Sequence, residues 1–202
     1  MIAPAFAALN SSTNSRITVV LESFPTHIDG QLIVISAEAT VEIIVNEIEM
    51  KATEKNFKID LSMKGELLNL YKVLSTFPEV KEVLNKLKEK NYKLAILSNG
   101  TPALLNELVK SYNLDNIFND IFSIEEVKFY KPHPKVYNLP IEKYQIQKNE
   151  VAYLSANTWD VSAGGNYGFN PVWVNRKNSI FDNLDYVPKY QVENLGKLLD
   201  IL

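Results

Sequence analysis

The residues best suited to chemistry in this sequence follow a short apolar run. In LAILSNGTP, residues 94–102, a predicted buried strand ends at Ser98, Asn99 and Gly100, and a predicted helix begins directly afterwards. A hydroxyl, an amide and free backbone N–H groups would then face one crevice, which is an arrangement that can bind an anion. The alternative is structural, because Asn99-Gly100 is also typical of a turn and Thr101 of a helix cap.

A lysine in a proline-flanked loop could supply positive charge to such a site. In FYKPHPKVY, residues 129–137, the proline after Lys131 favours an extended conformation at that lysine. Its ammonium group could balance a carboxylate. Taken alone, a loop lysine is more often solvated, since lysine prefers the protein surface.

A third segment offers the matching acid. In YLSANTWDVSAGG, residues 153–165, a strand ends at Ser155, Asn157 follows, and a helix is predicted from Thr158 with Asp160 in its first turn. The alternative is again structural. Asn157 can cap the helix, and the positive end of a helix stabilises an aspartate.

Short strands and helices alternate in the second half of the chain and would position these residues. Strands are predicted at 92–97 (YKLAIL), 151–154 (VAYL) and 171–174 (PVWV), with a weaker one near 117–123. Residues 101–112 have helical spacing, with Thr and Pro at the start. This alternation builds a parallel sheet covered by helices, whose strand ends meet at one edge.

A mostly helical segment interrupts the α/β pattern. Residues 37–90 contain long helical patterns and no alternation typical of strands. We therefore expect an α/β core domain at 16–36 and 91–202, a helical cap insert at 37–90, and a loose N-terminal tail at 1–15. A cap beside the sheet would cover the crevice at the strand ends.

The composition excludes several classes of function. Of 202 residues, 24 are acidic and 21 basic, none is cysteine, and His27 and His133 are the two histidines. Thiolate metal sites are excluded, a multi-histidine site is disfavoured, and no basic cluster indicates nucleic acid. No window resembles a membrane span, and the apolar start MIAPAFAAL lacks the positive charge of a signal peptide. We expect a cytoplasmic protein with a small-molecule substrate and no membrane partner.

Taken together, the three segments have a specific order: strand-SN-G, then KP, then strand-S-x-N-x-x-D. With the phrases LSNG, YKP, SANTWD and GFNPVWVNR, the sequence resembles the haloacid dehalogenase superfamily, and within it the (S)-2-haloacid dehalogenase type. The resemblance is close over 66–202 and fainter back to Ala37. It implies a Rossmann-like parallel sheet with a helical cap. Family members are commonly homodimers, so a homodimer is the assembly that the resemblance suggests.

The acids of this chain favour the metal-independent branch of that superfamily. A magnesium-dependent phosphohydrolase needs several carboxylates around the cation. Its last motif would supply acids where this chain has Ser155 and Asn157, and Asp160 is the one acid there. A single carboxylate opposite Lys131 suits a site in which lysine supplies the positive charge. We expect no metal, no cofactor, and a small carboxylate substrate with an activated carbon.

The resemblance also implies roles for substrate-side residues. Ser98 and Asn99 would hold the substrate carboxylate, while Tyr137 and Trp159 would line or support the pocket. An apolar lining strips water from an attacking carboxylate and raises its reactivity.

Further roles follow for the residues around the nucleophile. In the family, an aspartate attacks the halogen-bearing carbon, halide leaves, and water hydrolyses the resulting ester. Lys131 would orient that nucleophile and Ser155 would hydrogen-bond it. Asn157 would bind the halide or position the attacking group, and Asp160 would steer Lys131 and the hydrolytic water.

The first motif of the family, an apolar strand followed by Asp-x-x-x-Thr, has no aspartate here. The stretch RITVVLESFPT, residues 16–26, has the spacing with Glu22 as nucleophile and Thr26 as the threonine. Glutamate adds one methylene, and a shift of about 1 Å can lower a rate about a hundredfold. The alternative is that Glu22 is a solvated residue after an edge strand.

The halide site is the second departure from the family. The family carries a cap arginine for the leaving halide, whereas Arg16 and Arg176 are the two arginines here and neither lies in that region. His27 is a conceivable substitute. The leading hypothesis is therefore a 2-haloacid dehalogenase-type hydrolase, impaired by the missing aspartate. The alternative is a non-catalytic family member that keeps the fold and an anion-binding crevice. A phosphatase is disfavoured by the missing second acid.

Overall fold

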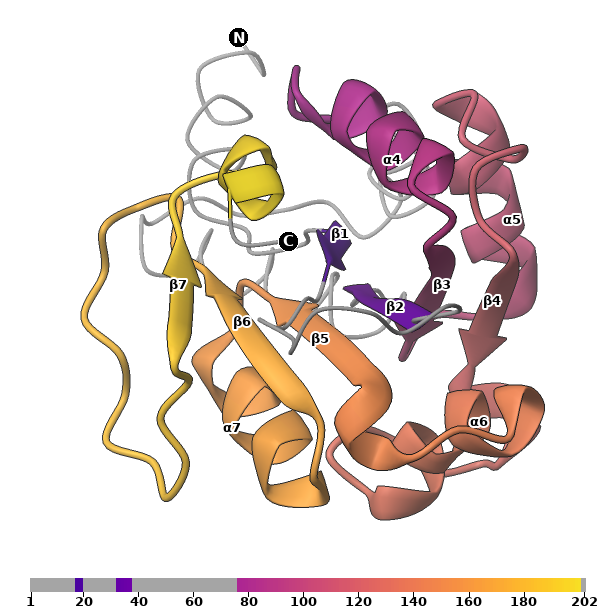
Figure 1. Ribbon diagram of the computed structural model, residues 1–202. Helices are drawn as coiled ribbons and strands as arrows, with labels where there is room; N and C mark the ends of the chain where they lie inside the picture. Colours follow the sequence, from indigo (N-terminus) through magenta and orange to yellow (C-terminus); the bar gives the residue numbers. More distant parts are fainter. Residues whose placement is uncertain (1–16, 20–31, 38–75, 201–202) are drawn as a thin grey trace, which may run out of the picture.

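A β-sheet forms the centre of the computed structural model, which describes residues 17–19, 32–37 and 76–200 (Figure 1). In this part of the chain seven strands form one sheet, with the order β4-β3-β2-β5-β6-β7 and β1 paired to β2. Neighbours along the path from β4 to β7 are parallel. The strands are β1 (Ile17–Val19), β2 (Leu32–Ala37), β3 (Lys93–Ser98), β4 (Asp120–Ser123), β5 (Val151–Ser155), β6 (Asn170–Val174) and β7 (Tyr190–Val192).

The strands predicted at 92–97, 151–154 and 171–174 are confirmed as β3, β5 and β6, and the weaker one as β4. All five residues of β5 are buried, as are the last five of β3. Strands covered by helices on both faces have continuous apolar runs of this kind rather than alternation.

A short strand opens the stretch 16–26, in which Glu22 is the expected nucleophile. Its described part, β1, is antiparallel to β2 and lies off the parallel path. The central place belongs to β2, which pairs in parallel with both β3 and β5. Both stretches are short apolar runs, and pairing with distant strands, not local pattern, decides which is central. Glu22, Thr26 and His27 lie outside the described residues.

Helices cover both faces of the sheet. Figure 1 shows α4 (Val80–Glu89) and α5 (Pro102–Ser111) on one side, with α6 (Pro134–Tyr144) and α7 (Thr158–Tyr167) on the other. Thr101 caps α5 as predicted, its hydroxyl accepting the Leu104 N–H at 3.3 Å. Pro140 lies within α6. Short 3-10 turns are η2 (Ile124–Glu126), η3 (Lys148–Glu150) and η4 (Leu195–Asp200).

Most of the predicted cap insert at 37–90 lies outside the described residues. Its last helix, α4, buries Val80, Val83, Leu84 and Leu87 in the hydrophobic core that also contains β3 and β5. The described end of the expected insert therefore packs with the α/β core, while the division of the rest stays a prediction. Within the described residues, no helix has the length and apolar character that crossing a membrane requires.

Candidate functional site

The strand order places one edge of the sheet where ligands bind in open α/β folds. From β2 the chain leads outward to β3 and β4, then crosses over to β5, β6 and β7 on the other side. The direction in which successive strands are added to the sheet therefore reverses between β2 and β5. Ligands of such sheets bind outside the carboxyl ends of the strands at this reversal. Ser98 ends β3 and Ser155 ends β5, so two predicted site residues lie at this edge.

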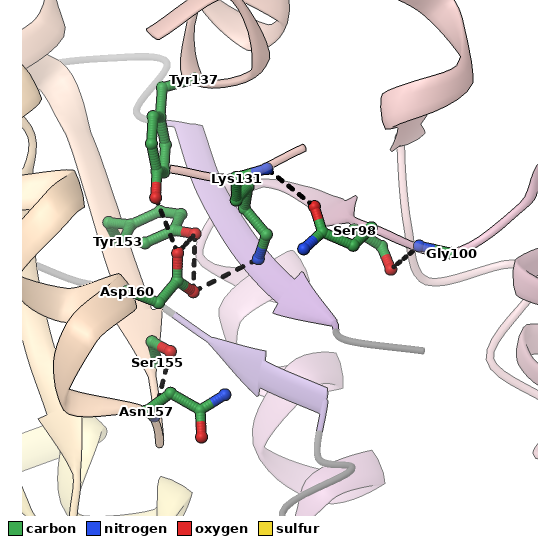
Figure 2. Close-up of polar contacts among 9 residues, drawn as sticks. Ser98, Gly100, Lys131, Tyr137, Tyr153, Ser155, Asn157 and Asp160 are labelled. Atoms are coloured by element: carbon green, nitrogen blue, oxygen red, sulfur yellow. Dashed lines mark hydrogen bonds and ion pairs between the residues drawn. The ribbon is translucent and has the colours of Figure 1, made fainter. Parts of the chain in front are cut away.

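The predicted convergence of Lys131 and Asp160 is confirmed. The Lys131 ammonium lies 3.3 Å from Oδ2 of Asp160, and both side chains have 0% exposure (Figure 2). Lys131 comes from the loop before α6, and Asp160 from the first turn of α7. The positive end of α7 favours a carboxylate at that position. Buried charges need partners, and each of these two is the other's ion-pair partner.

Two tyrosines complete the surroundings of Asp160. The Tyr137 hydroxyl donates to Oδ1 at 2.9 Å, and the Tyr153 hydroxyl lies 2.8 Å from Oδ1 and 2.9 Å from Oδ2 (Figure 2). Hydrogen bonds to an ionised acceptor are stronger than those between neutral groups. The carboxylate is therefore held from two sides by phenols, besides the lysine.

Tyr153 is the member of this group that the sequence analysis missed. It was treated as one apolar residue of the strand at 151–154, and it is wholly buried in β5. The signal available was its phenol, because a buried tyrosine hydroxyl usually has a hydrogen-bond partner. Tyr137 contacts Asp160 directly, and its expected role in lining or supporting a pocket stays a prediction.

Ser98 and Asn99 shape the end of β3. Ser98 is buried, and its Oγ accepts the Gly100 N–H at 2.9 Å. Asn99 Oδ1 accepts the Lys131 backbone N–H at 3.0 Å, which joins this turn to the lysine loop. The structural interpretation of the turn thus holds for both side chains, and their contact with a substrate carboxylate stays a prediction.

Ser155 and Asn157 form the turn between β5 and α7. Ser155 is wholly buried, and its Oγ accepts the Asn157 N–H at 3.2 Å (Figure 2). Asn157 is the N-cap residue of α7, yet its side chain makes no capping hydrogen bond. The structural alternative, in which the Asn157 side chain caps α7, is therefore wrong. Its predicted role toward the halide or the attacking group remains untested.

Trp159 lies beside the buried lysine. Trp159 is 36% exposed, and the centroid of its indole ring lies 6.0 Å from the Lys131 ammonium. This distance is at the outer limit of a cation–π interaction. The position agrees with a residue that borders the site, and its role in lining a pocket stays a prediction. Glu22 and Thr26 lie outside the described residues, so their predicted roles stay predictions as well.

Clusters of metal ligands are absent from the described residues. No group of three or more histidine, cysteine, aspartate or glutamate side chains there could hold a metal ion. The donors around Asp160 include the Lys131 ammonium and the phenols of Tyr137 and Tyr153. A cation would have to displace the ammonium from that carboxylate, so these residues do not fit a magnesium site.

A family model described as "Haloacid dehalogenase-like hydrolase" matches residues 15–174. The chain belongs to this family. Among curated haloacid dehalogenase relatives, it is 36% identical over 141 residues to (S)-2-haloacid dehalogenase 4A of Burkholderia cepacia, covering 69% of this chain and 61% of that protein. It is 29% identical over 161 residues to haloacetate dehalogenase H-2 of Moraxella sp. (strain B), covering 80% of this chain and 72% of that protein.

Solved structures of haloacid dehalogenases share the fold. The L-2-haloacid dehalogenase RSc1362 matches with a TM-score of 0.73 and 29% identity, covering 79% of this chain and 70% of that one. The predicted α/β class and the predicted family are confirmed. This haloacid dehalogenase-like chain spans 61% of the length of its Burkholderia cepacia relative, so the activity of the whole protein is a matter for proposal.

Proposed function

We propose that this chain binds a small carboxylate of the 2-haloalkanoic acid class, without a metal ion, at the carboxyl edge of its sheet. The residues concerned, called the carboxyl-edge site below, are Ser98, Asn99, Lys131, Ser155, Asn157, Trp159 and Asp160, with Tyr137 and Tyr153 behind them. The observation that carries the proposal is the buried Lys131–Asp160 ion pair at this edge.

The charge of the site supports an anion rather than a cation. Lys131 is the cation of the pair. The Asp160 carboxylate accepts hydrogen bonds from the Lys131 ammonium and from the phenols of Tyr137 and Tyr153. A carboxylate that accepts these hydrogen bonds offsets less of the positive charge of Lys131 than a carboxylate without them would. Hydroxyl and amide groups from Ser98, Asn99 and Asn157 stand at the same edge. Such neutral groups suit a small carboxylate.

The names of the relatives support the substrate class. Curated relatives at 36% and 33% identity are named (S)-2-haloacid dehalogenases. In the hydrolytic form of this proposal, a protein carboxylate attacks the halogen-bearing carbon, halide leaves with the bonding electrons, and water hydrolyses the ester. Lys131 would orient the attacking group, and Asp160 would hold Lys131 in place. Glu22 is the acid that the sequence offers for the attack.

Calorimetric titration tests the binding proposal directly. (S)-2-Chloropropionate should bind in the presence of EDTA, whereas 2-chloropropionamide, which has a similar shape and no charge, should not. Asn157→Ala should weaken binding about tenfold, which corresponds to one hydrogen bond. Asn106→Ala is the matched control, because Asn106 is exposed on α5 and its amide donates to the Pro102 carbonyl.

Two results would contradict the proposal. Equal affinity for the acid and the amide would remove the requirement for charge. Magnesium-dependent hydrolysis of p-nitrophenyl phosphate, with no binding of the haloacid, would place the chain with the phosphatases of the superfamily.

A further inference from the structure

The central strand of the sheet brings an uncharged residue to the carboxyl-edge site. Ser36 of β2 pairs with Leu97, and Ala37 pairs with Ser98. On the other side, Ile35 pairs with Leu154, which directly precedes Ser155. Ser36 therefore lies at the carboxyl end of β2, paired with Leu97 of β3 and with Thr18 of β1, one residue before Ala37, which pairs with Ser98.

The sequence around Ser36 has the spacing of the first family motif. The apolar run LIVI at 32–35 is followed by Ser36-Ala-Glu-Ala-Thr40, in which a serine stands where Asp-x-x-x-Thr has its aspartate. The competing stretch follows β1, whose Ile17 pairs with Ala37 and whose Val19 pairs with Ile35. β1 thus runs from the carboxyl edge toward the opposite edge, whereas β2 ends at the carboxyl edge.

We infer that Ser36 occupies the position of the nucleophilic aspartate, and that this chain binds a 2-haloalkanoate without breaking its carbon–halogen bond. The inference rests on the proposed function, because it concerns the same site and the same ligand. It also revises the choice of Glu22 as the residue in the nucleophile's place.

The chemistry of serine explains why the bond would survive. A carboxylate is ionised at neutral pH and leaves an ester that water can hydrolyse. A serine hydroxyl would need a base to remove its proton, and displacement of halide would leave an ether, which water does not cleave under these conditions. Serine nucleophiles work beside a general base. Asp160 is held by Lys131, Tyr137 and Tyr153, so it is not available as that base.

Loss of this carboxylate also changes the charge that a substrate meets. An aspartate at the end of β2 would repel the carboxylate of the ligand, and like charges in a protein interior disfavour each other. A neutral serine removes that repulsion. The natural chain should therefore bind unreactive propionate more tightly than a Ser36→Asp variant does. Ser36→Asn, which has the size of the aspartate variant and no charge, should also bind propionate more tightly than Ser36→Asp.

The experiment combines titration with measurement of released chloride. The natural chain should bind (S)-2-chloropropionate and return it intact after long incubation, a result that needs no variant. Ser36→Asp should release chloride: the introduced carboxylate oxygen bonds to C2 as the C–Cl bond breaks, chloride leaves with the electron pair, and water then cleaves the ester to 2-hydroxypropionate and a proton. Ser36→Asn should release none.

The outcomes separate this inference from the proposed function. Chloride release by the natural chain that Glu22→Gln abolishes would overturn the inference and make Glu22 the nucleophile. A Ser36→Asp variant that binds propionate as tightly as the natural chain, without chloride release, would also overturn it. Both results leave carboxylate binding intact. If neither the natural chain nor Ser36→Asn binds the haloacid, the proposed function itself fails.

Discussion

The Tyr153 hydroxyl lies 2.8 Å from one carboxylate oxygen of Asp160 and 2.9 Å from the other, so a single phenol bridges both oxygens of a wholly buried acid. The Tyr137 ring packs edge-on against the Tyr153 ring, with centroids 5.6 Å apart. The position of the carboxylate, and with it that of the Lys131 ammonium, therefore depends on aromatic packing between α6 and β5.

Tyr153→Phe tests this dependence. The change removes a hydrogen bond to a charged group and should lower the free energy of unfolding by about 1.5–3 kcal/mol. Urea denaturation measures it. Tyr167→Phe is the control, because the Tyr167 hydroxyl donates at 2.7 Å to the neutral amide oxygen of Asn138 and should contribute about 1 kcal/mol. Equal losses in the two variants would contradict a special role for the bridge.

Asp160→Asn tests the buried ion pair. The variant leaves the Lys131 ammonium buried without its carboxylate, and removal of one partner of a buried pair destabilises by about 3–5 kcal/mol. Lys197→Ala removes a partner of Asp200 from a pair whose side chains are 57% and 65% exposed, and it should have a much smaller effect. A small loss for Asp160→Asn would show that water reaches the pair in solution.

Gly164→Ala tests the packing behind Tyr153. A Cβ atom at Gly164 would lie 2.5 Å from Cδ1 of the Tyr153 ring, so the ring or α7 would have to move. Overpacking of this kind destabilises by about 1–3 kcal/mol. Gly196→Ala is the control, because its nearest neighbour is the flexible Asn194 side chain at 3.0 Å. Thermal unfolding compares the two variants. Combining Gly164→Ala with Tyr153→Leu should restore part of the loss, and additive losses would contradict the clash.

Helices and strands with a clear local sequence pattern could be predicted from that pattern alone. Thr101 followed by Pro102 marks the start of α5, and the apolar run at 151–154 marks β5. The convergence of Lys131 and Asp160 followed from the order of motifs, since parallel strands bring their carboxyl ends together.

Strand pairing and side-chain contacts between residues far apart in the sequence could not be predicted from local patterns. Both β1 and β2 are short apolar runs, and their roles differ because β2 pairs with residues near 97 and 154. The bridge from Tyr153 to Asp160 joins a strand to the following helix, and no spacing rule predicts which of several tyrosines reaches an acid. The packing of α4 against the core likewise depends on tertiary contacts that a helical pattern does not specify.

Glu79 should make stability depend on pH. Burial alone would raise the pKa of Glu79, but hydrogen bonds from its own backbone, from Arg176 and from the Leu195 N–H, together with the Arg176 charge, outweigh burial and lower that pKa. The Arg176 guanidinium lies 2.5 Å from the Glu79 carboxylate. A lowered pKa in the folded state means that the stabilisation is present above the pKa of the unfolded chain, and is lost as pH falls through the folded value.

Comparison of the natural chain with Glu79→Gln checks the sign. The natural chain should be more stable at pH 7 by up to about 1 kcal/mol, since the pair is partly exposed. The difference should shrink as pH falls below about 4.5, the ordinary value for glutamate. Urea midpoints at several pH values measure it. Arg176→Gln should remove part of the same pH dependence, and a difference that grows toward acid would contradict the assignment.

The placement of β2 affects how the protein can be made. Residues Leu32–Ile35 pair with Val151–Leu154, so this pairing cannot form until the later segment has been synthesised. Parallel pairing across so long a stretch is slow. On the ribosome, β2 emerges well before β5 has been synthesised, and its open edge can meanwhile pair with other nascent chains. Truncations that end before Val151 should therefore aggregate, and efficient expression should require a chaperone or slow synthesis.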